Sequence, residues 1–214
     1  SCLVNPYACH ETVLVAKPFT NVKKIAVVGA GPAGLAFATT AAKRGHQVTL
    51  FDAANQIGGQ FNVAKLIPGK EEFYETLRFF KRQLELGSVD LKLGQYADLE
   101  LLKSGQFDEV VLATGVTPRH LNIEGSDSPK VLDYLEVLRD KKPVGKRVAV
   151  IGAGGIGFDV SEYLTHIGES ATLNPKKFFA EWGIDTSYAH RGGKTTHEAE
   201  ESPREVYLLN SKNT

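Results

Sequence analysis

The sequence predicts an α/β fold in which one strand–turn–helix unit occurs twice. Short apolar runs that end in glycine alternate with helical segments, which is the pattern of a parallel sheet covered by helices. A Gly-x-Gly-x-x-Gly motif follows such a run at Gly29 and again at Gly152, 123 residues later, which is a domain-sized interval. These observations indicate an internal duplication of two Rossmann-like dinucleotide-binding units.

The first unit is predicted over residues 22–121, after a connector (residues 1–21) that has no clear periodicity. Residues 24–28 form a short apolar run before glycine, as expected of a buried parallel strand. The alanine-rich segment 33–44 follows as a helix that Gly45 closes. The other elements predicted for this unit are strands at 47–51, 89–93 and 109–113 and a helix at 71–86, with Phe73, Leu77, Phe80 and Leu84 on one face.

The second unit is predicted over residues 122–214. A loop rich in Gly, Ser and Pro leads into a helix at 131–139, a strand at 146–151, a helix through Leu164 and a strand at 205–209. The intervening stretch 167–203 is long for a connection inside a domain, which implies either a function or partial disorder. The sequence begins with serine, contains no methionine and ends one strand into this unit, so we expect a piece of a longer protein with its second unit truncated.

The composition argues against several classes of partner. Lys and Arg together number 25, as do Asp and Glu, so no basic excess exists to recruit nucleic acid or an anionic membrane. Residues 25–42 carry no charge, but their glycines and Pro32 favour a strand–turn–helix over a membrane span. Two cysteines cannot form a disulfide scaffold, and no signal peptide precedes them. We therefore expect a cytoplasmic protein whose partners are small-molecule nucleotides, with no nucleic acid and no membrane.

The first glycine motif has the context of a dinucleotide site. Gly29 permits the tight turn, Gly31 lets the backbone approach a pyrophosphate, and Gly34 lets helix and strand pack closely. The helix N-terminus then faces the phosphates, and Asp52, at the end of the next strand, accepts hydrogen bonds from the ribose. The residues predicted to bind this nucleotide are Gly29, Gly31, Pro32, Ala33, Gly34 and Asp52. The glycines alone do not distinguish FAD from NAD, and a purely structural turn is the alternative.

The second motif, with Gly152, Gly154 and Gly157, is predicted to hold the reductant. The strand at 205–209 is followed by Asn210, Ser211 and Lys212 rather than by an acid. The missing acid removes a repulsion toward a 2′-phosphate, and Lys212 is predicted to pair with it, which favours NADPH; an ordinary solvated lysine is the alternative. The six histidines are scattered and predict no metal site.

Two further segments carry a family resemblance. Gly58-Gly59-Gln60 follows the predicted ribose acid, and the strand at 109–113 runs into Ala113-Thr114-Gly115. These features resemble the flavin domain of flavoproteins with two dinucleotide-binding domains, the group of thioredoxin and glutathione reductases. The resemblance implies FAD at the first site, with Gly59, Gln60, Ala113, Thr114 and Gly115 close to it. A free-standing thiol reductase is disfavoured because the sequence has no Cys-x-x-Cys pair.

Segments along nearly the whole chain resemble the bacterial NADPH-dependent 2,4-dienoyl-CoA reductases. These segments are residues 2–6, 8–11, 29–37, 45–52, 57–62, 67–74 and 181–185. That family joins an FMN-bearing TIM barrel, a [4Fe–4S] cluster, an FAD domain and an NADPH domain. The resemblance implies that electrons pass from NADPH to FAD, the cluster, FMN and finally a dienoyl thioester of fatty acid β-oxidation.

The same resemblance implies which cofactors and ligands this chain holds and which belong only to the intact protein. Cys2 is implied as one cluster ligand, whereas the other ligands, FMN and the barrel belong to the intact protein only. No residue of this chain is implied to be catalytic, and Ser211 stands where the family tends to have Arg.

The alternative function is a nucleotide-binding module that takes no part in electron transfer. Barrel-fused relatives of the trimethylamine dehydrogenase type keep this domain to hold ADP. Both hypotheses require that the amides of the first glycine turn and the Asp52 carboxylate cradle an adenosine diphosphate moiety.

Overall fold

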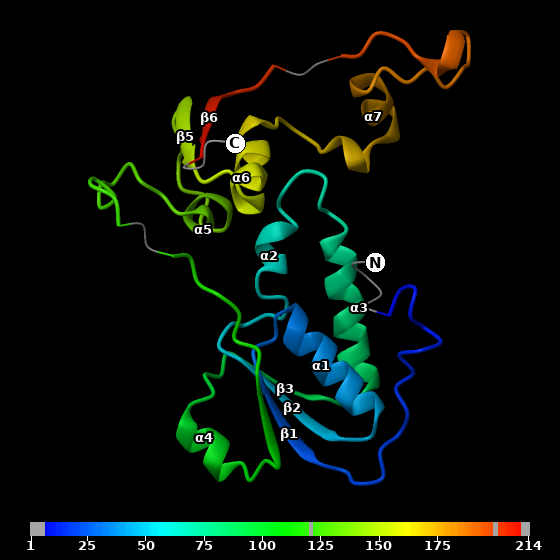
Figure 1. The fold of residues 1–214 in the computed structure, drawn as a ribbon, viewed down its shortest axis with the longest axis vertical. Coiled ribbons are helices and arrows are strands. Elements are labelled where there is room, and N and C mark those ends of the chain that lie inside the picture. The colour runs from blue at the N-terminus through cyan, green and yellow to red at the C-terminus, as the bar shows by residue number, and fades with distance from the viewer. Residues whose placement is uncertain (1–6, 120–121, 199–200, 211–214) are drawn as a thin grey trace. The chain divides into compact units, whose positions relative to one another are not determined.

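The computed structural model describes residues 7–119, 122–198 and 201–210 of the chain. It has two compact units (Figure 1), the first comprising the chain up to Ala64 together with Glu72–Thr117. The second comprises Lys65–Glu71 together with the chain from Pro118 onward. Both units place helices against parallel strands, so the predicted α/β class is confirmed. The assignment of residues 22–121 to FAD and 122–214 to NADPH stays a prediction.

The first unit is built on a four-stranded parallel sheet of order β3-β2-β1-β4. Its strands are β1 (Lys24–Val28), β2 (Gln47–Asp52), β3 (Asp90–Leu93) and β4 (Glu109–Leu112), each within one residue of the predicted bounds. The chain moves outward from β1 to β3 on one side and then returns to β4 on the other side of β1. The strand order therefore reverses between β1 and β4, and such a switch point is where open α/β sheets bind ligands.

Within the described residues of the first unit, the helices that accompany this sheet are α1 (Pro32–Lys43), α2 (Phe61–Ala64), α3 (Phe73–Leu86) and α4 (Leu99–Ser104). Helix α1 begins directly after the glycine turn, because Gly31 is extended and Pro32 fits the first helical position. It ends before Gly45, whose φ of +96° suits a glycine. The predicted helix at 71–86 begins two residues later, at Phe73. The short helices α2 and α4 were not predicted.

The core of the first unit lies between one face of the sheet and helices α1 and α3 (Figure 1). Its buried members are Ile25, Val27, Ala30, Leu35, Ala38, Ala41, Val48, Leu50, Phe80 and Leu84. On the other face Phe51 packs edge-on against Phe107, with ring centroids 6.0 Å apart. Toward the β4 edge, Val110 and Leu112 are 43% and 74% exposed, so this second face is only partly covered among the described residues.

The second unit contains a parallel pair, β5 (Arg147–Ile151) and β6 (Glu205–Leu209). Its other elements are α5 (Tyr134–Leu138), α6 (Gly155–Thr165), α7 (Pro175–Glu181) and 3-10 turns at Ala171–Leu173 and Arg191–Gly193. The long connection at 167–203 thus carries α7 and both turns over its described part. One of its loops is organised by Asp185, whose carboxylate accepts hydrogen bonds from Ser187 and His190.

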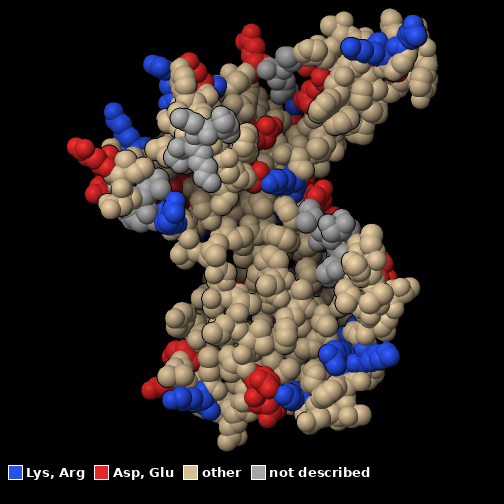
Figure 2. All heavy atoms as spheres, viewed as in Figure 1, with Lys and Arg blue, Asp and Glu red and all other residues tan. Residues whose placement is uncertain are grey.

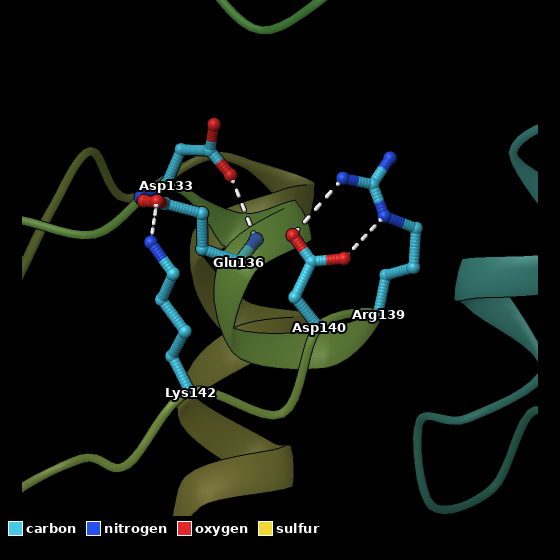
Figure 3. Close-up of polar contacts among 5 residues, drawn as sticks. All are labelled: Asp133, Glu136, Arg139, Asp140 and Lys142. Carbon is cyan, nitrogen blue, oxygen red and sulfur yellow. Dashed lines mark hydrogen bonds and ion pairs between the residues drawn. The ribbon is translucent and has the colours of Figure 1, made fainter.

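Helix α5 shows why a predicted helix can be too long. Residues 131–139 were expected to be helical, but Asp133 acts as the N-cap and the helix begins at Tyr134. The Asp133 side chain accepts a hydrogen bond from the Glu136 N–H, and the Glu136 carboxylate accepts one from the Asp133 N–H, each at 2.9 Å (Figure 3). Lys142 forms an ion pair with the same Glu136 carboxylate. Arg139 donates hydrogen bonds from Nε and Nη2 to the two carboxylate oxygens of Asp140.

Residues Lys65–Glu71 belong to the second unit although they precede α3 of the first. Lys70 Nζ lies 2.6 Å from both carboxylate oxygens of Asp159 in α6. The Thr172 hydroxyl donates to Glu71 Oε2 at 2.7 Å, and the Gly69 N–H donates to Ser170 Oγ at 3.3 Å. Burial raises the pKa of Glu71, but hydrogen bonds from Thr172, Ser170 and Gly69 outweigh it and leave this pKa below its ordinary value.

Figure 2 shows the charged side chains on one face of the molecule. On this face Lys and Arg lie among Asp and Glu, and no extended area of one sign forms among the described residues. Helix α3 is the longest helix in the described part of the chain, with 14 residues. No helix described there combines the length and the apolar character needed to cross a bilayer.

Candidate functional site

The first glycine turn lies at the carboxyl edge of the β3-β2-β1-β4 sheet, at its switch point. The Gly29 N–H donates to the Phe51 carbonyl at the end of β2, and the Ala113 N–H donates to the Val28 carbonyl, each at 2.8 Å. The turn is therefore held between the ends of the two strands that flank β1.

Two of the three glycines are required by packing. Gly29 has a φ of +107°, and a methyl group added to it would lie 2.2 Å from the Ala113 carbonyl oxygen. A methyl group on Gly34 would lie 1.8 Å from the Gly29 carbonyl oxygen. Both distances are far below van der Waals contact, so these positions exclude any side chain while α1 stays where it is.

Gly31 differs, because a methyl group there would meet no heavy atom within 4 Å. It is the N-cap of α1 but offers no side-chain cap, and the first turn contains no acidic residue. Leu35 is the first residue of this helix whose N–H reaches a helical carbonyl, that of Gly31 at 2.9 Å. The amides of Ala33 and Gly34 therefore have no helical acceptor, and open space lies beside the helix end that carries them.

Asp52 turns its carboxylate back toward this glycine turn. Oδ2 accepts a hydrogen bond from the Ala30 N–H at 2.6 Å, and Oδ1 accepts one from the Ala54 N–H at 2.8 Å. Each oxygen keeps a second lone pair, so the carboxylate can still accept hydrogen bonds from a ligand hydroxyl.

A second glycine turn closes against the first. The Gly58 N–H donates to the Ala30 carbonyl at 2.7 Å, and a methyl group on Gly59 would lie 3.0 Å from the Gly31 Cα. The Gln60 amide donates to the Val116 carbonyl at 3.3 Å, which ties this turn to the segment after β4. Thr114 and Gly115 precede Val116 in that segment, and Thr114 Cα would lie 3.2 Å from a methyl group on Gly29. The structure thus brings together the residues predicted around the first nucleotide.

The turn after β5 repeats this geometry. The Gly152 N–H donates to the Leu209 carbonyl at 2.9 Å, just as Gly29 donates to Phe51. A methyl group on Gly157 would lie 1.8 Å from the Gly152 carbonyl oxygen, and Gly154 has open space around its Cα. Since Leu209 corresponds to Phe51, Asn210 corresponds to Asp52, and the second unit has an amide where the first has a carboxylate.

Two predicted site residues lie outside the part of the chain that the structure describes. Cys2, the implied cluster ligand, and Lys212, the predicted 2′-phosphate partner, lie outside the described residues. Within the described part of the chain, no three His, Cys, Asp or Glu side chains are grouped so as to hold a metal ion. Asp159 lies in the second turn of α6, which begins at Gly155.

Sequence reasoning missed the partner of Asp159. Lys70 lies 89 residues away in the sequence, and no local periodicity connects the two positions. The bond from Ala30 to Asp52 was likewise not predicted, although a carboxylate at the end of β2 was the signal for it.

Comparison with known proteins identifies the family. The profile of the pyridine nucleotide-disulphide oxidoreductases matches residues 23–177, which is more than two thirds of the chain. The chain belongs to the pyridine nucleotide-disulphide oxidoreductase family. It is therefore a module of flavin- and NAD(P)H-linked oxidoreductases, and its Rossmann-like fold is the one expected of this family.

Individual relatives of this oxidoreductase module are much longer proteins. The chain is 36% identical over 168 residues to a bilirubin reductase of Mediterraneibacter gnavus, covering 78% of this chain and 26% of that protein. It is 36% identical over 173 residues to a cinnamate reductase of Clostridium sporogenes, covering 81% and 26%. A solved 2-naphthoyl-CoA reductase in complex with 2-naphthoyl-CoA superposes with a TM-score of 0.72 at 27% identity, covering 98% of this chain and 36% of that chain. The module thus spans about a quarter of the length of these curated relatives.

Proposed function

We propose that this chain is the FAD-binding and NADPH-binding part of a barrel-fused reductase of the 2,4-dienoyl-CoA reductase type. The observation that carries the proposal is the duplicated turn at the carboxyl ends of β1 and β5, where each first glycine bonds to the neighbouring strand and each third glycine excludes a side chain. FAD, when bound, supplies the acceptor for a hydride from NADPH. The protein supplies binding, orientation and electrostatics.

The first site fits the adenosine diphosphate part of FAD. Gly31 leaves room for a pyrophosphate, and the free amides of Ala33 and Gly34 offer donors to it at the positive end of α1. The Asp52 carboxylate, fixed by two backbone amides, is available to the ribose hydroxyls. Gly59, Gln60 and the segment Ala113–Gly115 line the same edge of the sheet and would border the rest of the dinucleotide.

The second site favours a nucleotide with a 2′-phosphate, NADPH, over NADH. A carboxylate at the end of the second strand selects the free 2′-hydroxyl of NADH and repels a 2′-phosphate. Here β6 ends at Leu209 and Asn210 occupies that position, so the repulsion is absent. Lys212 is proposed to pair with the 2′-phosphate, as expected from the sequence.

The activity of the whole protein rests on the relatives and on the resemblance to the dienoyl-CoA reductases. The names of the relatives describe reductases that act on bilirubin, cinnamate and 2-naphthoyl-CoA. We extend this to a 2,4-dienoyl-CoA substrate in a cytoplasmic enzyme that also carries FMN and a [4Fe–4S] cluster with Cys2 among its ligands. None of the residues of this chain is assigned a catalytic role.

Flavin retention tests the proposal directly. The purified chain is incubated with FAD and desalted, and its visible spectrum and flavin fluorescence are recorded. Retained FAD with quenched fluorescence, lost in the D52N variant, supports the first site. A folded sample that releases all of its FAD speaks against it. NADPH added to the FAD-loaded chain should bleach the flavin band.

An ADP-holding module without redox work is the second candidate. Its support is that the Asp52 carboxylate and the N-terminal amides of α1 would bind the adenosine diphosphate group, which ADP and FAD have in common. Calorimetric titration with ADP and with FAD separates the two functions. Binding of ADP with no binding of FAD and no bleaching by NADPH would favour the module.

A further inference from the structure

We propose that residues 182–197, which we call the 182–197 loop, bind the adenosine 3′-phosphate end of a coenzyme A thioester. This inference rests on the proposed function, because it concerns the CoA part of the proposed substrate. The loop follows α7 in the long connection to β6 (orange in Figure 1) and lies outside both glycine motifs.

The backbone of the 182–197 loop is organised by its own hydrogen bonds. The Thr195 N–H donates to the Gly183 carbonyl, and the Asp185 N–H donates to the Gly193 carbonyl, each at 2.8 Å. Gly183 has a φ of +60°, and a methyl group on it would lie 2.5 Å from the Thr195 carbonyl oxygen. The loop is therefore shaped before a ligand arrives, which reduces the entropy that binding costs.

Two aromatic side chains of this loop are open to solvent. Trp182 packs its indole against Phe178 of α7, with ring centroids 5.9 Å apart, yet it remains 68% exposed. Tyr188 is 84% exposed and has a φ of +58°, a conformation that residues with a Cβ rarely adopt and that occurs preferentially at ligand sites. Exposed aromatic rings stack on nucleobases, whose faces are flat and apolar.

The exposed charge of the 182–197 loop is positive. Arg191 and Lys194 are both exposed, and neither forms an ion pair with another residue of the described chain. The antiparallel bridge between Lys194 and Ile184 brings this lysine, across the loop, to the residue two positions after Trp182. The loop thus combines aromatic faces with a guanidinium and an ammonium group, which are the partners of a phosphate.

The carboxylate of the loop is turned away from this surface. The Asp185 side chain is only 12% exposed, and it accepts hydrogen bonds from the Ser187 hydroxyl and N–H and from the His190 N–H. Its Oδ2 also lies 3.0 Å from His190 Nδ1. Hydrogen bonds from Ser187 and His190 hold the pKa of Asp185 well below its ordinary value. Asp185 is therefore ionised, but its charge is engaged inside the loop and opposes a phosphate little.

Coenzyme A carries both features that the loop matches, since its adenine is aromatic and its 3′-phosphate is an anion. The solved 2-naphthoyl-CoA reductase, a complex with a CoA thioester, matches 98% of this chain, so the match includes most of the 182–197 loop. A nucleic acid shares the same chemistry, but the chain has equal numbers of basic and acidic residues and offers no excess charge to a polyanion. A single nucleotide unit is therefore the favoured occupant.

The test uses the fluorescence of Trp182, which is the only tryptophan of the chain. Acetyl-CoA added to the purified chain should quench this emission to saturation. The Kd should be on the order of 1 mM, because one stacked base and exposed charges give weak affinity. Dephospho-CoA, which lacks the 3′-phosphate, should bind at least about threefold more weakly, and pantetheine, which lacks the nucleotide, should not quench.

Matched variants assign the effect to the two cations. R191Q and K194Q should each raise the Kd for acetyl-CoA about threefold, and the double variant about tenfold, because exposed charge contacts contribute little singly. K176Q removes an exposed lysine from α7, outside the loop, and should leave the Kd unchanged.

Other outcomes would overturn the inference. The absence of saturable quenching by acetyl-CoA would refute the site, and equal affinities for acetyl-CoA and dephospho-CoA would refute recognition of the 3′-phosphate. Wild-type affinity in the double variant would refute the role of the cations. Quenching by a single-stranded oligonucleotide but not by acetyl-CoA would replace the thioester with a nucleic acid. FAD retention and bleaching by NADPH are measured separately, so failure of this loop and failure of the proposed function are distinct results.

Discussion

The sharpest prediction contrasts two glycines of the same motif, Gly31 and Gly34. An alanine at position 34 would place its methyl group 1.8 Å from the Gly29 carbonyl oxygen, a backbone atom that no side-chain rotation can move aside. An alanine at position 31 would meet no heavy atom within 4 Å, and its backbone is extended at a φ of −76°. Gly34 is thus expected to serve packing and Gly31 to serve the ligand.

The magnitudes follow from these distances. Forcing a methyl group into a packed contact costs typically about 1–3 kcal/mol, and a backbone neighbour places G34A at the upper end. Replacing glycine by alanine inside a helix returns roughly 1 kcal/mol, which leaves a net loss of about 2 kcal/mol. For a unit of this size that loss lowers the melting temperature by about 8–16 °C. G31A should keep the wild-type melting temperature or exceed it slightly, because alanine restricts the unfolded chain.

The assay combines thermal unfolding followed by circular dichroism with FAD titration. G31A should fold normally yet weaken FAD binding about tenfold or more, a loss of at least ~1.4 kcal/mol, because its methyl group enters the open space beside the helix end. In the second unit, G157A and G154A should repeat the contrast, with NADPH as the ligand. A G34A protein that melts like the wild type, or a G31A protein that unfolds early, would refute the packing argument.

Three further predictions follow from single side chains. D52N should weaken ADP and FAD binding about tenfold in calorimetry, since it removes the charge that strengthens hydrogen bonds to the ribose, whereas NADPH affinity should not change. The hydrogen bond from Lys142, with that from the Asp133 N–H, holds the pKa of Glu136 below its ordinary value. The stability contributed by Glu136 is therefore complete above the ordinary pKa and disappears as pH falls through the lowered one; urea unfolding between pH ~3 and ~6 should show a shallower acid limb in E136Q than in the wild type. D185N should loosen the loop that ends at His190, so limited proteolysis should cut it there faster than in the wild type, and an unchanged cutting rate would refute that role.

Local sequence signals explain why the bounds of β1 and α1 could be predicted closely. The apolar run before Gly29, Pro32 at the first helical position and Gly45 after the last turn each determine one boundary through their own backbone preferences. The same kind of signal exists for α5, where Asp133 followed by Glu136 has the capping-box spacing, but the apolar residues Val131 and Leu132 extend the helical pattern beyond this cap. Helices as short as α2 and α4 contain too few residues to show a period.

Contacts between distant segments could not be predicted from one sequence. The ion pair of Lys70 with Asp159 and the hydrogen bond of Glu71 with Thr172 depend on where a loop before α3 folds, and no repeat or spacing encodes this. Asp52 was placed correctly at the end of β2 because strand ends are marked by local sequence. Its bond to the Ala30 amide became visible only with the register of β1 and β2.

The assignment of Lys65–Glu71 to the second unit changes how the chain connects its parts. The polypeptide passes from one compact unit to the other three times, after Ala64, after Glu71 and after Thr117. Neither unit is a continuous stretch of sequence. A protein cut once after residue 117 would therefore yield an amino-terminal piece that still contains Lys65–Glu71, a segment of the second unit. Anyone wishing to express the units apart would have to bridge Ala64 to Glu72 with a designed loop and supply the excised heptapeptide separately.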